Sequence, residues 1–321
     1  MGKHERKLIQ EAENLIVKIL KGQATTSDDE CNKWYSYAFE IAQEIKKDIT
    51  TIRRIEHVGN RYDLIGDLII NDGSKDIFIE VKMSEKPSGK CTKANISQNA
   101  LTELGLFKGD LKSWSEFREL NCHQKLISSL LSSYEHIPDE IKGPNMSSNI
   151  IKEKIARYIR NKSRNGELKA KRILNAIHGV DKVIKLKYLS YLSEKPQDED
   201  KIKRFYILIM LGIHKIEKMR ELMKKRNLIN QAKNLLVYYG NKENQKIIVT
   251  KEDVGEKVNK IMNKVDKFKI FFKEGQTNCK LVGISKGKIV PLLNIVLHWK
   301  NIAQGIKTPC LNIFDITPDD L

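Results

Sequence analysis

The hydrophobic and polar positions of the first fifty residues recur with the period of an α-helix. Between residues 4 and 21, apolar side chains return every three or four positions, and Gly22 follows the last of them. This spacing predicts a first helix over residues 4–21. The Ser-Asp-Asp cluster at residues 27–29 is a favourable N-cap, so a second helix is expected from there to about Asp48.

The period changes to that of β-strands after Asp48. Alternating or continuous apolar runs predict strands over residues 51–57, 64–70 and 76–83. The Asn-Asp-Gly-Ser sequence at residues 71–74 is typical of a tight turn. The second and third of these strands are therefore expected to form a hairpin.

The remainder of the chain reads as helical first and mixed afterwards. Asn95, with Gln98 three residues later, resembles a capping box and predicts the start of a helix. The pattern from about 115 to 200 is mainly helical, whereas residues 205–213 fit either a buried strand or the start of a long helix. Strand-like runs return at residues 235–239, 246–250, 268–272, 281–285 and 311–314. Together these patterns predict an α/β fold in three consecutive portions, 1–110, 111–200 and 201–321.

Composition indicates a folded protein, and the net charge adds a first indication of what it binds. The chain has 321 residues and 40% hydrophobic content, enough for a folded core, and no apolar run long enough to span a membrane. Its start lacks the features of a signal peptide, so a cytoplasmic location is expected. Lysine and arginine total 58 against 41 acids, a formal charge of +17, which favours binding to a polyanion such as nucleic acid. The alternative is a lysine-rich composition whose excess charge is merely solvated.

One pair of predicted strands brings three charged side chains together. Asp67 precedes the turn and Glu80 follows it, so the hairpin register sets these carboxylates across from each other. Lys82 lies two residues after Glu80 and projects from the same face of the strand. Carboxylates can hold Mg²⁺, which polarises a phosphate and activates water, and the ammonium can orient or deprotonate that water or neutralise developing charge. The three residues therefore predict a centre that hydrolyses phosphodiesters.

The Glu-x-Lys spacing alone carries little information. It occurs six times in the chain, and five copies lie in helix-like or loop-like segments where charged side chains are simply solvated. Only Glu80 and Lys82 lie in an apolar strand that follows an acid-bearing strand. The alternative interpretation of this copy is an ordinary edge hairpin with a polar face.

Asp67, Glu80 and Lys82, in this order on paired strands, resemble the motif of the PD-(D/E)xK nuclease superfamily. The resemblance covers roughly residues 27–107, with Gly66 in the place of the motif's proline. It implies a mixed-sheet, restriction-endonuclease-like core, followed here by a helical insertion and a C-terminal α/β portion. It also implies catalytic roles for Asp67, Glu80 and Lys82, and Mg²⁺ coordination by Asp67, Glu80 and Val81.

The same resemblance implies an auxiliary acid. Members of the superfamily often add an acid from the first helix of the core, and Glu40 or Glu44 could play that part here, with Glu56 as a weaker candidate. Asp63 competes with Asp67, but the hairpin register would place it beyond the lysine.

Two polar segments are candidates for contact with DNA. The first follows the lysine-bearing strand, although helix capping explains Gln98 equally well. The second is the stretch 152–172, with nine Lys or Arg and two acids, for which a solvated helix face is the alternative. The expected contacts are Lys90, Lys93, Ser97, Gln98, Asn99, Arg157, Arg160 and Lys162.

The length of chain beyond the core resembles a type II restriction endonuclease more than a compact resolvase. The expected activity is Mg²⁺-dependent, sequence-specific hydrolysis of double-stranded DNA. A homodimer is expected because palindromic sites favour two-fold symmetric proteins. Two alternatives remain open: a structure-selective repair or recombination nuclease, and a nucleic-acid-binding protein without catalytic activity.

Overall fold

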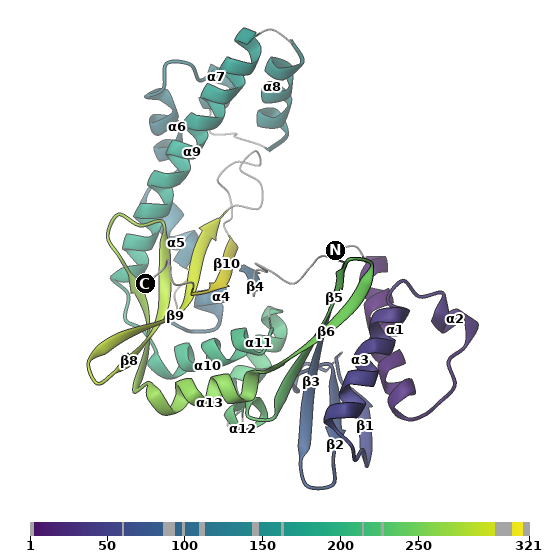
Figure 1. Cartoon of the computed structure of the whole chain (residues 1–321). Coiled ribbons are helices and arrows are strands. Elements are labelled where there is room, and N and C mark those ends of the chain that lie inside the picture. The colour runs from purple at the N-terminus through teal and green to yellow at the C-terminus, as the bar shows by residue number, and fades with distance from the viewer. Residues whose placement is uncertain are drawn as a thin grey trace. The chain divides into compact units, whose positions relative to one another are not determined.

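The computed structural model describes residues 3–59, 61–85, 94–97, 100–108, 113–142, 148–161, 164–213, 215–225, 228–298 and 310–316. The chain divides into two compact units, each built from two stretches of sequence (Figure 1). Unit 1 comprises Met1–Lys93 and Lys203–Asp266, and unit 2 comprises Ala94–Ile202 and Lys267–Leu321. The sequence predicts three consecutive portions instead, because a chain that leaves a unit and later returns to it gives no local signal.

Unit 1 is built around a mixed sheet in the order β1-β2-β3-β5-β6. Strand β3 runs parallel to β5, and the other neighbours are antiparallel, as the predicted α/β class requires. Its strands are β1 (Arg54–His57), β2 (Leu68–Asn71), β3 (Asp76–Ser84), β5 (Leu235–Glu243) and β6 (Lys246–Asp253). Its helices are α1 (Lys3–Leu20), α2 (Ser27–Glu30), α3 (Tyr35–Asp48), α11 (Ile216–Met223), α12 (Leu228–Ala232) and α13 (Val254–Lys264), while α10 (Glu199–Met210) crosses from unit 2.

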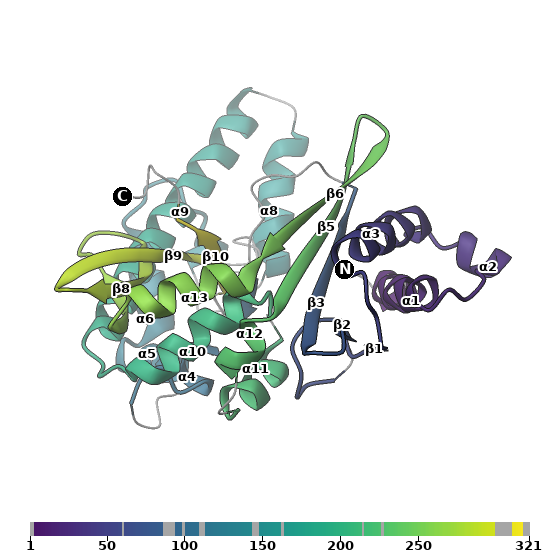
Figure 2. The ribbon, with the colours of Figure 1, turned by 60° about the horizontal axis from the view of Figure 1, so that its bottom comes forward.

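The two faces of this sheet have different neighbours. Helices α1 and α3 lie on one side of β3, and α11 and α12 lie on the other (Figures 1 and 2). Ile79 and Val81 join a hydrophobic core with the apolar stripes of α1 and α3, including Leu15 and Ile41. Because successive side chains of a strand point to opposite faces, Glu80 turns away from this core.

The prediction of one continuous helix from residue 27 to about Asp48 is wrong, because the structure has two helices, α2 and α3, in this segment. Thr26, rather than Ser27, caps α2 in a capping box with Asp29, and the helix stops at Glu30. The Asn32 side chain accepts a hydrogen bond from the Trp34 N–H at 2.8 Å, which stabilises a turn before α3. This local side-chain bond breaks the helix that the apolar spacing suggests.

The predicted turn of the β2–β3 hairpin is confirmed. The carboxylate of Asp72 accepts hydrogen bonds from the backbone N–H groups of Ser74 and Lys75 and from the Ser74 hydroxyl, at 2.8–2.9 Å. These hydrogen bonds lower the pKa of Asp72 from 3.8 to about 2, the largest contribution coming from the Ser74 N–H.

Replacing Asp72 by alanine is expected to destabilise the protein at neutral pH and to do so less in acid. The pKa of Asp72 is depressed in the folded state, so its ionised form stabilises the fold above about pH 4, and this contribution is lost as the pH falls toward 2. Urea unfolding of both proteins between pH 7 and pH 3 measures the difference. A difference in stability that grows toward acid pH would contradict the assignment.

Unit 2 combines helices with an antiparallel sheet in the order β4-β10-β9-β8-β7. Its strands are β4 (Ala94–Ser97), β7 (Lys267–Phe272), β8 (Asn278–Ser285), β9 (Lys288–His298) and β10 (Cys310–Asp315). Its helices are α4 (Ala100–Glu103), α5 (Ser113–Leu120), α6 (His123–Ser132), α7 (Asp139–Lys142), α8 (Ser148–Arg160) and α9 (Arg164–Ser193). The helical character expected for residues 115–200 is confirmed. The segment 205–213, for which the sequence allowed either a strand or a helix, is helical as far as Met210, where α10 ends.

Two predictions in unit 2 need correction. Residues 94–97 form strand β4 rather than the start of a helix, because Asn95 pairs with Asn312 of β10 from the far end of the chain. Strand β9 is absent from the sequence prediction, since Pro291 interrupts its apolar run. Among the described residues, no helix has the length and apolarity needed to cross a membrane.

Candidate active site

The hairpin register brings Asp67 and Glu80 together as expected. Leu68 pairs with Ile79, and the N–H of Asp67 donates to the Ile79 carbonyl at 2.7 Å, which continues the ladder to the next pair. Oδ2 of Asp67 also accepts the N–H of Val81 at 2.9 Å. The carboxylate of Asp67 is thus fixed to the backbone of the strand that carries Glu80.

Lys82 completes the cluster that the sequence predicts. Its ammonium forms an ion pair and hydrogen bond with Oε1 of Glu80. The Glu80 side chain is 8% exposed, whereas that of Lys82 is 41% exposed, so the acid is held inside while its lysine reaches solvent. Desolvation opposes the charge on Lys82, but Glu80 and Asp67 outweigh it and raise the pKa of the lysine to about 12.

Asp67 lies near two other acids, Glu80 and Glu13. Desolvation, then the charges of Glu80 and Glu13, raise the pKa of Asp67 well above its usual value, against the opposing effects of Lys82 and the Val81 N–H. Ionising this carboxyl is therefore costly unless a cation comes close. The raised pKa is typical of functional carboxylates, although structural acid clusters show it too.

Glu13, on helix α1, is the helix acid that the structure places at the cluster. It is 7% exposed, and its Oε2 lies 2.7 Å from Nε2 of His57 on β1. Gly59 lies beside the pair. A Cβ at this position would be 3.0 Å from Glu13 Oε2 and 3.2 Å from Asp67 Oδ1, so a side chain would fill the space these groups face. The sequence analysis missed Glu13, and its acidic position on the otherwise apolar stripe of the first helix was the available signal.

The auxiliary acids proposed from the sequence lie elsewhere in unit 1. Glu40 is exposed on α3, and Glu44 pairs with Lys47 at 2.8 Å. Neither is among the main causes of the raised pKa of Asp67. The rival acids are also engaged in exposed ion pairs, Asp63 with Arg61 at 2.8 Å and Glu56 with Arg54 at 3.4 Å.

A second lysine, which the sequence analysis did not single out, lies on α11, on the side of the sheet toward which Glu80 turns (Figures 1 and 2). Lys218 on α11 is 8% exposed, and Glu80 and Asp67 are the acids whose charges act on it. Burial lowers the pKa of Lys218 despite these two acids, and Lys215 and Lys82 add to the lowering. No sequence motif marks this residue, because its neighbours in the cluster are more than a hundred positions away.

Two glycines shape the site. Gly66 has a φ of +72°, and a Cβ there would lie 2.8 Å from the carbonyl oxygen of Ile79, so only glycine fits. Proline, whose ring holds φ near about −65°, could not take this conformation. Gly212 also has a φ of +72°, and a Cβ there would lie 3.4 Å from Glu80 Oε1 and 3.6 Å from Lys82 Nζ.

The donor set fits Mg²⁺ better than a metal that needs a full protein cage. Within the described part of the chain, no group of three or more His, Cys, Asp or Glu side chains is arranged to hold a metal ion. Mg²⁺ is commonly held by one or two carboxylates, with water and substrate phosphate as its remaining ligands. Asp67 and Glu80 supply two such carboxylates, and the charge of Glu13 acts on Asp67.

The residues proposed for DNA contact are only partly described. Arg157 and Arg160 are exposed on α8, whose Ile151 and Ile155 are buried. Lys154 on the same helix pairs with Glu140 at 2.8 Å. Ser97 belongs to strand β4, although its side chain lies outside the described part of the structure. Lys90, Lys93, Gln98, Asn99 and Lys162 also lie outside the described residues.

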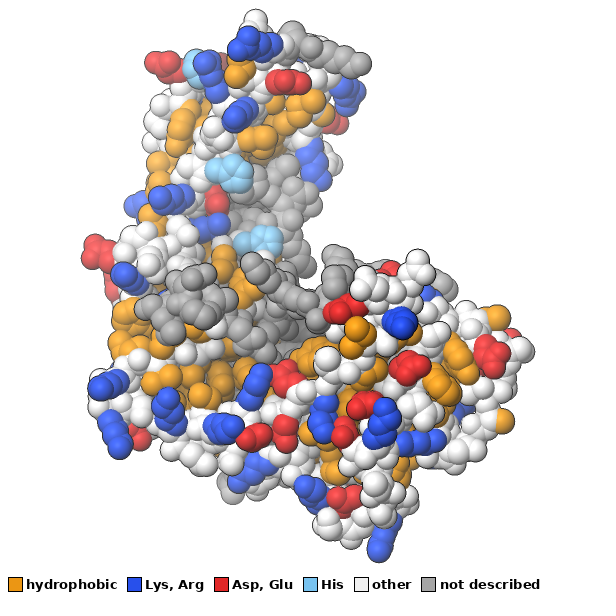
Figure 3. Space-filling view, viewed as in Figure 1, with side chains coloured by type: hydrophobic (Ala, Val, Ile, Leu, Met, Phe, Trp, Pro, Cys, Tyr) orange, Lys and Arg blue, Asp and Glu red, His pale blue; other side chains and the backbone are white. Residues whose placement is uncertain are grey.

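On one face of the molecule the positive charge is spread out. On the face shown in Figure 3, lysine and arginine side chains of the described residues are scattered and have acids among them, rather than forming one patch. The net charge of +17 therefore does not by itself mark a binding surface.

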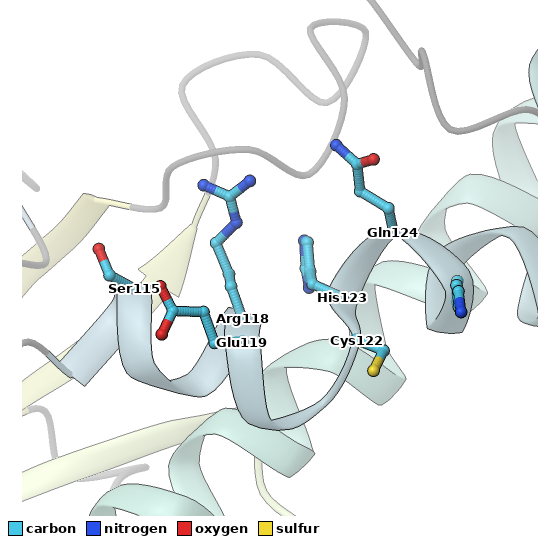
Figure 4. Close-up of a pocket in the computed structure, with 7 residues that line it drawn as sticks. Ser115, Arg118, Glu119, Cys122, His123 and Gln124 are labelled. Atoms are coloured by element: carbon cyan, nitrogen blue, oxygen red, sulfur yellow. The ribbon is translucent and has the colours of Figure 1, made fainter.

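A pocket in unit 2 is separate from this cluster. It has a volume of about 480 Å³ and is lined by Ser115, Arg118, Glu119, Cys122, His123, Gln124 and Lys125. Arg118, His123 and Gln124 point to the same side, from α5 and the start of α6, whereas Cys122 points away (Figure 4). Its lining includes none of the acids or lysines of the candidate active site.

Comparison with family models, curated proteins and solved structures gave no match to this chain.

Proposed function

We propose that this protein is a Mg²⁺-dependent endonuclease that hydrolyses double-stranded DNA, most like a type II restriction endonuclease. The observation that carries the proposal is the convergence of Asp67, Glu80 and Lys82 on neighbouring strands, with Asp67 held by a backbone N–H and the other two by an ion pair. The raised pKa of Asp67 supports it, because a carboxyl that resists ionisation alone is stabilised as an anion by a bound cation. The positive net charge adds support for a polyanionic substrate.

In this proposal Asp67 and Glu80 hold Mg²⁺, with Val81 as the third ligand inferred from the superfamily. The bound ion supplies Lewis-acid polarisation of the phosphate and a lower pKa for an attacking water. Lys82, with a pKa of about 12, keeps its proton at neutral pH. It therefore acts as a hydrogen-bond donor that orients the water or neutralises charge in the transition state, rather than as the base.

Digestion of a sequenced plasmid tests the proposed function. The purified full-length protein is incubated with Mg²⁺, and the fragment ends are mapped. A restriction endonuclease gives discrete fragments with a common end sequence, whereas a structure-selective nuclease cuts at cruciforms or branches. Failure to cut plasmids of different sequence and branched DNA at every Mg²⁺ concentration would favour the alternative of a nucleic-acid-binding protein without catalysis.

Removing Arg157 and Arg160 together is expected to weaken DNA binding and its dependence on salt. Both are exposed on α8 in a strongly basic segment. If each neutralises one phosphate, the double alanine variant should show a plot of log K against log salt that is shallower by roughly 0.9 per lost contact. If either reads a base, the loss should be larger on the cognate site than on random DNA, by about 1–3 kcal/mol. Binding is measured in Ca²⁺, which is expected to support binding without cleavage.

A matched variant controls for the loss of two charges. Lys246 and Lys264 are exposed in unit 1, and their double alanine variant changes the net charge by the same amount. An equal reduction in slope in both variants would show that Arg157 and Arg160 make no specific phosphate contact.

A further inference from the structure

Lys218 is a buried cation that neither the predicted motif nor the superfamily resemblance uses. Its side chain lies on α11, between exposed Lys215 and the buried residues Met219 and Leu222 of the same helix. A buried ammonium is costly unless acids or hydrogen bonds compensate for its lost hydration. The acids that attract it are Glu80 and Asp67, the two carboxylates assigned to the metal.

The chain segment that leads into α11 passes close to these acids. The chain ends α10 at Met210 and turns at Gly212, whose backbone comes close to the ion pair of Glu80 and Lys82. Because residue 212 is a glycine, no side chain from this position lies against Glu80 and Lys82. Helix α11, which follows, carries Lys218. Asp67 and Glu80 therefore have two neighbouring lysines, Lys82 on β3 and Lys218 on α11.

The charges around the site favour an anion once a divalent cation is bound. Glu13, Asp67 and Glu80 contribute three negative charges when ionised, and Lys82 and Lys218 contribute two positive charges. A bound Mg²⁺ would offset two of these negative charges, and Lys218 adds a positive charge to those that remain. Lys218 thus gives the loaded site the excess positive charge that complements a phosphodiester and, more strongly, its doubly charged transition state.

We propose that Lys218 is a second catalytic lysine, which would donate to a phosphate held by Mg²⁺ beside Asp67 and Glu80 and stabilise the negative charge that develops there. This inference rests on the proposed nuclease function. Lys82 and Lys218 have distinct positions, since one lies on the central strand and is partly exposed, while the other is buried on a covering helix.

The test compares wild type with Lys218→Met, which removes the charge and keeps the length of the side chain. At saturating Mg²⁺ we expect Lys218→Met to cut supercoiled plasmid roughly a hundredfold more slowly. We also expect its half-saturating Mg²⁺ concentration to fall by roughly three- to tenfold, because a positive charge beside the two carboxylates has been removed. Lys218→Arg, which keeps the charge, should retain at least about a tenth of the wild-type rate.

A measurement that does not depend on cleavage accompanies the rates. Mg²⁺ should raise the unfolding temperature of Lys218→Met more than that of wild type, since the ion binds the variant more tightly. Lys224→Met is the matched control, because Lys224 lies exposed at the end of the same helix, and it should behave as wild type in every assay.

Three outcomes would overturn the inference. A wild-type cleavage rate in Lys218→Met would show that the charge is not used. Slow cleavage with an unchanged or smaller Mg²⁺ effect on unfolding would assign Lys218 a structural role. If Lys218→Met does not fold, a Lys218→Arg protein that folds and responds to Mg²⁺ as wild type but does not cleave would exclude a purely electrostatic role. Absence of cleavage by the wild-type protein itself would instead reject the proposed nuclease function on which the inference rests.

Discussion

Asp67→Asn and Lys82→Met are each expected to lower the rate of Mg²⁺-dependent DNA cleavage by about a hundredfold or more. Asp67→Asn keeps the shape of the side chain but removes the negative charge assigned to the metal. Lys82→Met removes the ammonium that is paired with Glu80. Losing one group that stabilises charge in the transition state commonly costs about 10²–10³ in rate. Cleavage of supercoiled plasmid under saturating Mg²⁺ measures both effects.

The two variants should differ in their response to Mg²⁺. Asp67→Asn loses a proposed ligand, so it should need more Mg²⁺ for half-maximal cleavage, whereas Lys82→Met loses a cation and should not. Glu140→Gln is the control, since Glu140 belongs to another Glu-x-Lys sequence and is 56% exposed in an ion pair with Lys154. A wild-type rate in either active-site variant, or a large loss in Glu140→Gln, would show that the catalytic residues are misassigned.

Gly66→Ala is expected to have the largest effect on stability among the predicted variants. An alanine at the φ of +72° costs about 1–3 kcal/mol. In addition its Cβ would lie 2.8 Å from the carbonyl oxygen of Ile79, which is backbone and cannot move aside easily. The carbonyl oxygen of Ile79 also accepts the hydrogen bond from the Asp67 N–H, so a shift of Ile79 would displace Asp67. Cleavage should therefore fall together with stability. Chemical denaturation gives the free energy of unfolding, and plasmid cleavage gives the activity.

Gly22 offers a matched control for the strain at Gly66. It has a φ of +70° after α1, and a Cβ there would meet nothing within 4 Å. Gly22→Ala therefore reports the cost of the left-handed backbone without the clash. Equal losses of stability in Gly22→Ala and Gly66→Ala would contradict the role given to the contact with Ile79.

The core of the candidate site could be predicted from the sequence because it depends on local geometry. A turn at residues 71–74 fixes the register of the hairpin, and the register in turn places Asp67 opposite Glu80. Lys82 follows from the alternation of side chains along one strand. These relations involve only residues 67–82, so they can be inferred without knowledge of the rest of the fold.

The other contributors could not be predicted because they depend on packing between distant segments. Glu13 reaches the cluster through the packing of α1 against β1 and its contact with His57. Lys218 reaches it through the return of the chain after α10, which also supplies the parallel partner of β3. Pairing across more than two hundred residues likewise turns the segment at Asn95 into a strand. Local propensity has no access to any of these contacts.

The most direct test of the account is the rate at which purified full-length protein converts supercoiled plasmid to nicked and linear forms, for wild type and Glu80→Gln side by side. Glu80→Gln preserves the size of a side chain that is 8% exposed and removes the charge that pairs with Lys82. The account predicts cleavage by wild type that requires Mg²⁺ and stops with EDTA, and a rate at least about a hundredfold lower for Glu80→Gln. DNA binding in the absence of metal should be equal for the two proteins. Cleavage by Glu80→Gln at the wild-type rate, or wild-type cleavage that persists in EDTA, would contradict the assignment of this cluster as a Mg²⁺-dependent nuclease centre.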